Sequence, residues 1–493
     1  MSVTTREEFP LYINGEFRPG TGGDTFESIN PYTGEVWANV AEGTIEDIDT
    51  AVASARAALS GPWGQMTGAQ RSALLRRLGD LVGENAEKLA TLEVNDSGKL
   101  YKEMVGQTRF LPHWYQYFAG LADKIEGRQI PTSNPNYLVY TRKEPVGVIG
   151  AITPWNSPLL LLTFKLAPAL AAGCTFVVKP SEHSAASTAW FANLLDQAGF
   201  PPGVFNVVTG ESRELGKALA AHPGVDKVAF TGSTATGARV AQAAGANINK
   251  VTLELGGKSP QVVFPDADLN AAANGLLAGV FAATGQTCMA GSRLIVHESI
   301  HDELVDLVVE RANKIRLGDP NDPETQMGPV ANGPQYDKVM GYLKIARDEG
   351  GTIACGGETP EDLGGYFIRP TVITGVNKDS TVVKEEVFGP VLSVYTFKDE
   401  DEAISLANDT EYGLAGAVWT KDVHRGHRVA AAIKAGTVWI NAYRVVAPEV
   451  PFGGFGSSGV GRENGMDAVN EYTESKAVWV ELTGGTRDPF KLG

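Results

Sequence analysis

The sequence predicts an α/β fold with a doubly wound parallel sheet, because short apolar strands alternate with helices across its middle. The first strand, residues 146–152, is a continuous apolar run, as expected for a parallel strand that is covered on both faces. Strands at 175–179, 204–208 and 227–230 follow, with helical patterns between them. Such alternation produces a parallel sheet, and ligands of these sheets bind beyond the carboxyl ends of the strands.

The residues that precede this sheet predict a hairpin and then mostly helices. An Asn-Gly pair at the centre of residues 11–18 indicates a tight hairpin turn. A helix is expected over 44–59, where a threonine N-cap and an aspartate three residues later form a capping-box pattern. Helical periodicity then extends over 68–97 and 101–124, and residues 137–143 alternate as a strand does.

The second half of the chain repeats the alternation and predicts a second α/β unit. Its expected strands are 261–264, 293–296, 391–397 and 437–441, and its expected helices are 269–284, 301–314 and 401–408. A strongly apolar stretch at 157–178 is interrupted by Lys165 and Pro168. It therefore predicts a buried helix that runs into a strand, and not a membrane span.

Length, charge and cysteine content narrow the classes of function. A chain of 493 residues is long enough for two or three domains. Its net charge of −16 argues against nucleic acid and anionic membrane as partners, since both require clustered Lys and Arg. The three cysteines, at 174, 288 and 355, show neither metal-ligand spacing nor a disulfide framework. We therefore expect no metal site, and a cytoplasmic location, since the polar N-terminus does not resemble a signal peptide.

Two short stretches carry the candidate chemistry. Gly285–Cys288 reads as a tight turn that presents a single thiol, and Leu253–Lys258 places the Glu254 carboxylate before a glycine pair. A thiol and a carboxylate brought together suggest a nucleophile and a base. Each also has an ordinary interpretation, because a lone cysteine is usually a small buried hydrophobe and a glutamate near glycines usually marks a solvated loop.

Seven motifs in a fixed order point to a family. They are residues 154–156, 179–182, 230–237, 253–258, 285–288, 385–390 and 451–463. Over nearly its whole length the chain resembles the NAD(P)-dependent aldehyde dehydrogenase superfamily, in its CoA-independent, hydrolytic branch. The resemblance implies a cofactor domain with a doubly wound parallel sheet, a second α/β catalytic domain and a small β arm for oligomerisation.

The resemblance implies a role for each catalytic candidate. Cys288 attacks the aldehyde, the Asn156 amide and the Cys288 backbone N–H hold the resulting oxyanion, and Glu254 activates water to hydrolyse the thioester. Lys165 and Glu463 are similar to a proton-relay pair in part of the family. Taken alone, Asn156 fits a turn residue, and Lys165 and Glu463 fit a surface charge and a solvated acid.

The resemblance also implies NAD as cofactor, with NADP used at lower efficiency. Lys179 and Glu182 correspond to the adenosine-ribose contacts, and a carboxylate beside the ribose disfavours a 2′-phosphate. If Glu182 swings to solvent, Lys179 and Ser181 are left to hold that phosphate. Gly232 and Ser233 open a helix whose N-terminal amides suit a pyrophosphate. The remaining expected cofactor residues are Ile152, Trp155, Gly237, Leu255, Gly256, Glu386 and Phe388.

The substrate is expected to be an uncharged, fairly bulky aldehyde, either aromatic or medium-chain. Ser157 stands where many relatives have an aromatic ring, which implies a wider tunnel. Phe164 stands where succinate-semialdehyde relatives have an arginine, so no anchor for a second carboxylate is expected there. The expected lining consists of Phe110, Trp114, Ser157, Phe164, Thr287, Met289 and Phe452. Loop 443–450 carries no recognisable pattern.

The resemblance further implies a division into domains and an oligomer. The NAD-binding domain is expected over 1–125 and 146–257, and the catalytic domain over 258–457. Residues 126–145 and 458–493 would supply the oligomerisation arm and a C-terminal segment. Open strand edges on such an arm favour pairing with another chain, so a homodimer or homotetramer is expected.

Two other functions are considered beside the hydrolytic one. A CoA-acylating semialdehyde dehydrogenase of the same fold would pass the thioester to CoA, but that branch typically lacks the carboxylate that Glu254 provides. A non-catalytic binding protein that kept the fold would be expected to lose Cys288, Glu254 or Asn156, and all three are present.

Overall fold

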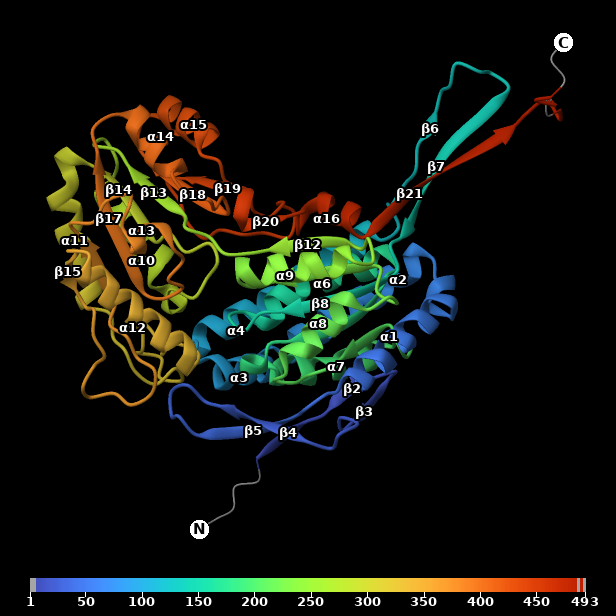
Figure 1. The fold of residues 1–493 in the computed structure, drawn as a ribbon, viewed down its shortest axis with the longest axis horizontal. Coiled ribbons are helices and arrows are strands. Elements are labelled where there is room, and N and C mark those ends of the chain that lie inside the picture. Colours follow the sequence, from blue (N-terminus) through green and yellow to red (C-terminus); the bar gives the residue numbers. More distant parts are fainter. Residues whose placement is uncertain (1–5, 486–487, 491–493) are drawn as a thin grey trace.

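A computed structural model describes residues 6–485 and 488–490 of the chain (Figure 1). Two α/β units, each built on its own large sheet, lie side by side, and a narrow β arm projects away from them. The outermost residues of the expected first domain and of the C-terminal segment, 1–5 and 491–493, lie outside the described residues. The expected domain limits stay predictions.

The first unit is organised around an eight-stranded sheet. In spatial order its strands are β20 (Gly459–Val460), β12 (Lys250–Glu254), β11 (Lys227–Thr231), β8 (Val148–Thr153), β9 (Thr175–Pro180), β10 (Phe205–Val207), β2 (Leu11–Ile13) and β3 (Glu16–Arg18). The five strands from β12 to β10 pair in parallel, which confirms the predicted parallel sheet. The predicted hairpin is also confirmed, since Asn14 and Gly15 both have positive φ between β2 and β3.

Helices cover both faces of this sheet, as the doubly wound prediction requires. One face packs against α1 (Ile45–Ser60), α8 (Arg213–Ala221) and α9 (Thr234–Gly245). The other packs against α6 (Pro158–Ala172) and α7 (Ala186–Ala198), with α2 (Gly68–Glu84), α3 (Ala86–Ser97), α4 (Tyr101–Phe110) and α5 (Pro112–Leu121) outside them. The apolar stretch predicted as a helix that runs into a strand is α6 followed by β9.

The helix boundaries follow local chemistry. The capping box at the start of α1 is present, because Thr44 and Asp47 bond each other's backbone N–H groups. The two long helical stretches predicted over 68–97 and 101–124 are each two helices. The second divides at Pro112, because proline has no N–H to donate but suits the first position of a new helix.

The second unit is organised around a seven-stranded sheet. In spatial order its strands are β15 (Thr352–Cys355), β16 (Thr371–Thr374), β17 (Val391–Phe397), β14 (Arg293–His297), β13 (Pro260–Val263), β18 (Ala415–Trp419) and β19 (Thr437–Ile440). All neighbours are parallel except β15 and β16. One face packs against α10 (Leu269–Val280) and α11 (His301–Asn313), and the other against α12 (Gly333–Asp348), α13 (Thr381–Lys384), α14 (Glu400–Asn408) and α15 (Val423–Ala432).

One predicted helix is too long. The expected helix over 269–284 ends at Val280, because Ala283, Thr284 and Gly285 all adopt left-handed backbone conformations that cannot continue a right-handed helix. Several elements of the two units were not predicted, among them β12, β18, α12 and α15. Strands β12 (KVTLE) and β18 (AGAVW) are only five residues long, and α12 mixes polar and apolar residues along its length.

The arm is a three-stranded antiparallel sheet that leaves the body of the molecule (Figure 1). Its long strands β7 (Tyr137–Pro145) and β21 (Thr473–Glu481) pair along their full length, and the short β6 (Gln129–Ile130) joins β7. A second small sheet, of β1 (Glu7–Phe9), β5 (Val36–Ala41) and β4 (Thr25–Ile29), lies near the N-terminus. The helix α16 (Gly465–Glu471) leads into β21.

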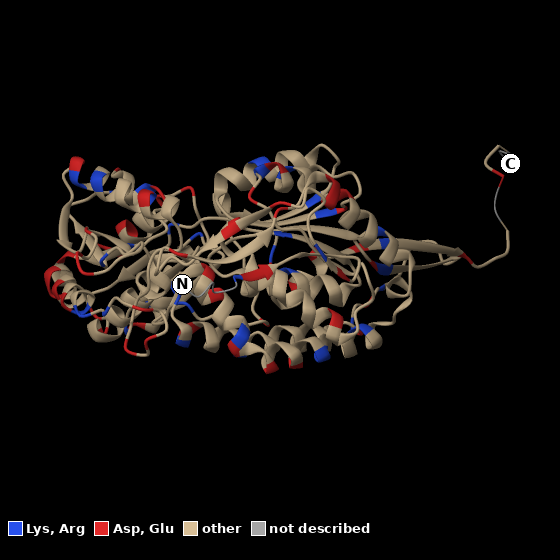
Figure 2. Cartoon of the chain, turned by 90° about the horizontal axis from the view of Figure 1, so that it is seen from below, with Lys and Arg blue, Asp and Glu red and all other residues tan. Residues whose placement is uncertain are grey.

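Two further observations concern the surface. Positions of basic residues (blue) and acidic residues (red) are interspersed along the outer helices in the view of Figure 2. Within the described part of the chain, no helix combines the length and the apolar character that crossing a bilayer requires.

Candidate active site

A cavity of about 120 Å³ lies where the carboxyl ends of β8, β11 and β12 face the second unit. It is lined by Pro154, Trp155, Asn156, Leu161, Thr231, Gly232, Ser233, Leu255, Gly256, Cys288, Gln335, Lys338, Glu386 and Phe388. Strand order explains this meeting, because parallel neighbours bring the loops after their carboxyl ends to one edge of the sheet. Nine of the predicted site residues line this one cavity.

Cys288 is presented by a strained loop that follows α10. Three successive residues, Ala283 to Gly285, have φ values of 52°, 57° and 69°, and only glycine adopts this region without strain. A Cβ at Gly285 would lie 2.1 Å from the Gly389 carbonyl oxygen. Gln286 fixes the loop further by accepting the Ala331 N–H at 2.9 Å. These contacts therefore fix the loop, and with it the orientation of the Cys288 thiol.

The Cys288 thiol is protonated in this environment. Burial raises its pKa to about 12, and the charges of Glu254 and Glu386 add to the effect, while backbone N–H groups of Met289 and Cys288 oppose it. The thiol must therefore lose its proton as it reacts, because the thiolate is the nucleophilic form. Cys174 and Cys355 are buried outside the cavity, and burial raises the pKa of both thiols.

Glu254 ends β12 and is almost fully buried. Neither of its side-chain oxygens has a hydrogen-bond partner among the described residues. Burial raises its pKa well above the usual value, the charge of Glu463 raises it further, and Lys165 opposes both effects. Such an isolated carboxyl group is a candidate proton carrier, because its pKa is moved toward neutrality.

Lys165 and Glu463 form an ion pair although they are far apart in the sequence. Their side chains are 0% and 1% exposed, so the interpretation as a surface charge and a solvated acid is wrong. Lys165 lies within α6, and Glu463 follows β20 at the edge of the sheet. The structure thus places a buried cation and two buried carboxyls, Glu254 and Glu463, in electrostatic range of one another.

Asn156 lies in the loop between β8 and α6 and is buried. Its Nδ2 donates to the Gln286 carbonyl oxygen at 2.9 Å, which ties the amide to the loop that carries Cys288. An amide nitrogen has a second N–H to offer. The arrangement therefore suits an oxyanion hole that combines this amide with backbone N–H groups of the cysteine loop.

The glycines of the cavity are needed for close approach. A Cβ at Gly237 would lie 2.4 Å from the Leu255 side chain, and one at Gly256 would lie 2.4 Å from Glu386 Oε2. Glu386 Oε1 accepts the Gly257 N–H at 2.8 Å. At Gly232, a Cβ would lie 2.5 Å from the ring of Phe230.

Two further features suit a bound dinucleotide. Ser233 caps the N-terminus of α9, where free backbone amides favour phosphate groups. The rings of Trp155 and Phe388 meet edge to face at 5.3 Å, which joins the two units at the cavity.

Lys179 and Glu182 lie at the end of β9, next to β8 in the sheet. Lys179 Nζ and Glu182 Oε2 are 3.5 Å apart, and Ser181 Oγ donates to the same oxygen at 3.3 Å. Ile152 of β8 pairs with Lys179 in the strand register. Burial alone would raise the pKa of Glu182, but Lys179 and its own backbone hold that pKa below the usual value. Glu182 is therefore a charged acceptor at neutral pH.

The identity of the family follows from a match over nearly the whole chain. A family model described as the aldehyde dehydrogenase family matches residues 17–478. The chain belongs to the aldehyde dehydrogenase family. It is therefore an oxidoreductase of the type that acts on small aldehydes.

Relatives share both the sequence and the fold of this aldehyde dehydrogenase. A (Z)-2-((N-methylformamido)methylene)-5-hydroxybutyrolactone dehydrogenase of Acinetobacter baylyi is 46% identical, and the match covers 99% of this chain and 100% of the relative. Aldehyde dehydrogenase family 2 member C4 of Arabidopsis thaliana is 44% identical over 96% and 95% of the two chains. The crystal structure of betaine aldehyde dehydrogenase from Staphylococcus aureus in complex with NAD+ has a TM-score of 0.96, with 42% identity over 98% and 96% of the chains.

The predicted lining of this aldehyde dehydrogenase includes a continuous row of aromatic rings. Phe110 and Trp114 meet at 5.3 Å between ring centroids, Trp114 stacks on Phe164 at 5.2 Å, and Phe164 meets Phe452 at 6.2 Å. Phe110 is 43% exposed and the other three rings are buried. Cys288 and Met289 pack against the large apolar cluster to which Trp114, Phe164 and Phe452 belong.

Two predicted lining residues have a polar environment. Ser157 is buried, and its Oγ accepts a hydrogen bond from Lys99 Nζ at 2.7 Å. The Lys99 ammonium group therefore lies directly beside the small Ser157 side chain, and the expected wider tunnel stays a prediction. Thr287 is buried and its Oγ1 has no partner among the described residues.

Several functional candidates were missed by the sequence reasoning. Gln335 and Lys338 on α12 line the cavity, and Gln335 Nε2 donates to the Phe388 carbonyl oxygen at 2.9 Å. Lys99 and Arg444 lie in electrostatic range of Cys288, which acts to raise the pKa of both side chains. A helix of mixed polarity such as α12 gives no signal for its role, and loop 443–450 has no periodicity at all.

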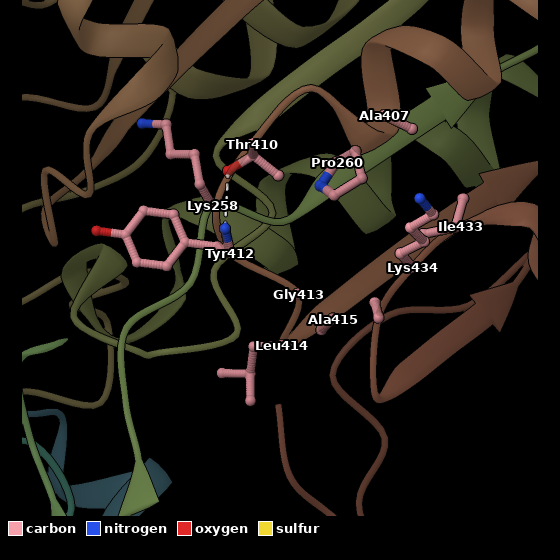
Figure 3. Close-up of a pocket in the computed structure, with 11 residues that line it drawn as sticks. Lys258, Pro260, Ala407, Thr410, Tyr412, Gly413, Leu414, Ala415, Ile433 and Lys434 are labelled. Carbon is pink, nitrogen blue, oxygen red and sulfur yellow. Dashed lines mark hydrogen bonds between the residues drawn. The ribbon is translucent and has the colours of Figure 1, made fainter. Parts of the chain in front are cut away.

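Lys258 shows why a motif residue need not be a site residue. Its Nζ has no hydrogen-bond partner among the described residues, and burial lowers its pKa to about 7. It borders a cavity of only about 10 Å³ beside Tyr412 and Thr410 (Figure 3), which has room for a water molecule at most. Among the described residues, no group of three or more His, Cys, Asp or Glu side chains is arranged to hold a metal ion.

Proposed function

We propose that this aldehyde dehydrogenase oxidises its aldehyde to a carboxylic acid with NAD, through a thiohemiacetal and then a thioester on Cys288. The observation that carries the proposal is a single cavity that holds the Cys288 thiol together with the Asn156 amide and the Glu386 carboxylate. Glycines whose Cβ atoms would collide with neighbours leave that cavity open to a close-fitting ligand.

The residues fit NAD on the chemistry of the cavity. The N-terminus of α9 offers amides to a pyrophosphate. Lys179 and Glu182 stand where an adenosine ribose would lie, and Glu386 and Phe388 stand near Cys288 for the nicotinamide ribose. NAD supplies the hydride acceptor when it is bound. The S. aureus betaine aldehyde dehydrogenase, which shares this fold, was crystallised with NAD+.

The protein's own groups carry the remaining steps of the proposed reaction. Cys288 gives its proton to solvent as its sulfur bonds to the carbonyl carbon. The Asn156 amide and the Cys288 backbone N–H stabilise the oxyanion. After the thioester has formed, Glu254 takes a proton from water, which releases the acid. The buried Lys165–Glu463 pair lies in electrostatic range of Glu254 and is proposed to pass the proton on.

NAD is proposed to be preferred over NADP because of Glu182. Its carboxylate is ionised and accepts hydrogen bonds, which suits the two ribose hydroxyls. A 2′-phosphate would add about two negative charges beside it, and Lys179, at 3.5 Å from Glu182, is already engaged with that carboxylate. His183 gives little compensation, because burial lowers its pKa.

The aromatic row is proposed to hold the body of an aromatic or medium-chain aldehyde. Four rings in contact form an apolar row that starts at the surface with Phe110, and its buried members belong to the apolar cluster on which Cys288 packs. The A. baylyi relative is named for a 5-hydroxybutyrolactone. Such a lactone is the ring-closed form of a 4-oxo acid. An aldehyde rich in oxygen atoms is therefore a further candidate substrate for this chain.

The arm is proposed to pair chains into a homodimer or homotetramer. Tyr137, Leu138, Trp479 and Val480 are exposed on its strands although they are large and apolar, and such surfaces favour association. Light scattering of the purified protein tests this. We propose the cytoplasm as its setting, since its three cysteines are free thiols.

NADH formation with a panel of aldehydes, with and without CoA, tests the proposed reaction. We expect benzaldehyde or octanal to yield NADH and the free acid without CoA. A requirement for CoA would favour the acylating alternative, which Glu254 argues against. Absence of NADH with every aldehyde, while NAD still binds, would favour a non-catalytic binding protein.

A further inference from the structure

We propose that Arg444 selects aldehydes that carry a carboxylate, so that the preferred substrate of the reaction proposed above is an aldehyde acid. The inference rests on that proposed function and revises the expectation of an uncharged substrate. That expectation depended on Phe164, which is buried and stacks on Trp114. The cation is supplied by a different segment, the loop that follows β19.

The loop that carries Arg444 is fixed against the wall of the site. Tyr443 Oη donates to the carbonyl oxygen of Met289, the neighbour of Cys288, at 2.8 Å. Trp439 Nε1 donates to the Val445 carbonyl oxygen at 3.1 Å, and its ring packs on Tyr443 at 4.7 Å. Val446 packs against the large apolar cluster of the first unit, as Cys288 also does. Arg444 therefore directly follows a residue that is hydrogen-bonded to the neighbour of Cys288.

The backbone at Arg444 is strained. Its φ is 63°, in the left-handed region that side chains other than Gly, Asn and Asp rarely adopt. Strain of this kind persists where the surroundings over-determine it, and it is concentrated at ligand sites. An arginine is among the residues least suited to this conformation. Its presence there is explained if its guanidinium is needed at that point of the wall.

The Arg444 guanidinium is half-buried and has no carboxylate partner of its own among the described residues. Among these residues it makes one hydrogen bond, from Nη1 to the Ala278 carbonyl oxygen at 3.1 Å. No ion pair within 4 Å joins it to a carboxylate in the described part of the chain, although Glu103 lies in electrostatic range. Burial lowers its pKa, and Glu103, Tyr443 and Cys288 oppose that effect. A carboxylate ligand would offer the remaining N–H groups acceptors in a planar, bidentate geometry.

A second cation strengthens the preference for an anion. Lys99 Nζ is buried at Ser157, next to Asn156. Burial lowers its pKa to about 8, with Arg444 acting in the same direction and Glu93, Glu103 and Cys288 opposing it. Glu93 is a weak counter-charge, because burial raises its own pKa. Two cations near the Cys288 thiol favour a substrate that carries a negative group between the entrance of the site and its aldehyde carbon.

The experiment compares each acid with its neutral methyl ester, so that length and shape are matched. The two pairs are 4-oxobutanoate with methyl 4-oxobutanoate, and 4-formylbenzoate with methyl 4-formylbenzoate. In the wild type we expect kcat/KM for the acid to exceed that for its ester by at least about tenfold in one pair, the range expected for a hydrogen bond to a charged group. Equal or better use of the ester in both pairs would overturn the proposal.

Variants assign the preference to Arg444. Arg444→Gln should lower the acid-to-ester ratio by about 10- to 100-fold, and Arg444→Gly should do the same while relieving the left-handed strain. Arg444→Lys should keep part of the ratio. Arg109→Gln removes a matched charge from an exposed ion pair with Glu87 and should leave the ratio as it is. Equal losses for acid and ester in the Arg444 variants would contradict the assignment.

Binding without turnover separates this proposal from the proposed reaction. With Cys288→Ala protein, calorimetry should show tighter binding of 4-formylbenzoate than of its methyl ester, and Arg444→Gln in that background should abolish the difference. If no aldehyde yields NADH, the proposed reaction is wrong but the proposed role of Arg444 is unaffected. If acid and ester bind equally to the Cys288→Ala protein, the proposed role of Arg444 is wrong but the proposed reaction is unaffected.

Discussion

Lys165 and Glu463 form a fully buried ion pair, and their charges act on the pKa of Glu254 in opposite directions. Lys165 lowers that pKa and Glu463 raises it. Glu254 must be ionised to accept a proton from water, so the rate of thioester hydrolysis should rise with pH through its raised pKa. The pair thereby sets the pH range in which the enzyme turns over.

Substitutions in this pair should shift the pH–rate profile in opposite directions. Lys165→Met removes the cation, so the Glu254 pKa rises further and the ascending limb of kcat should move to higher pH. Glu463→Gln removes a negative charge, so the limb should move to lower pH. Steady-state kcat between about pH 6 and pH 9 measures both shifts. Lys217→Met, from an exposed ion pair with Glu214, is the control. Shifts of the same sign for the two buried variants would refute this account.

Cys288→Ala should bind NAD but lower NADH formation by roughly 10⁴-fold or more, because the covalent route is lost. Cys174→Ala is the matched control, since that thiol is buried outside the cavity and donates to the Tyr472 carbonyl oxygen. Stopped-flow absorbance of NADH measures the first effect, and calorimetry measures NAD binding. An inactive Cys174→Ala beside an active Cys288→Ala would show that the nucleophile is misassigned.

Glu254→Gln should give a burst of NADH that is followed by a stall. The amide cannot take a proton from water, so the thioester on Cys288 accumulates after hydride transfer. Mass spectrometry of the quenched protein should detect the acyl group on Cys288. Glu474→Gln on the exposed arm, where Glu474 pairs with Lys250, is a control with the same change of charge. Full steady-state turnover in Glu254→Gln would remove this residue from the mechanism.

Glu182→Ser should shift the cofactor preference toward NADP. Removal of the carboxylate leaves Lys179 free of its partner at 3.5 Å and removes repulsion of the 2′-phosphate. We expect the NAD-to-NADP ratio of kcat/KM to fall by about tenfold, equivalent to one ordinary charged interaction. Measurement of kcat/KM for NAD and for NADP with one aldehyde, in the wild type and in the variant, tests this prediction. A wild type that favours NADP, or an unchanged ratio in the variant, would contradict it.

The sequence by itself determined the alternation of strands and helices in the first unit and the nature of the key side chains. Buried parallel strands are continuous apolar runs, and residues 146–152 show such a run without any tertiary information. The capping box at Thr44 and the Asn-Gly turn depend on neighbours within a few residues, so they too are readable locally. The motifs around Glu254 and Cys288 identify candidate chemistry because their residue types are rare in combination.

Only the tertiary structure decided how distant residues meet. Nothing local to Lys165 or Glu463 distinguishes a buried ion pair from two solvated charges, since burial depends on what packs against them. The end of α10 at Val280 is set by contacts of Thr284, Gly285 and Gln286 with segments 328–331 and 389, which hold residues 283–285 in left-handed conformations. No sequence pattern predicted a role for Arg444, since loop 443–450 has no periodicity. Its position in electrostatic range of Cys288 comes from long-range packing of that loop.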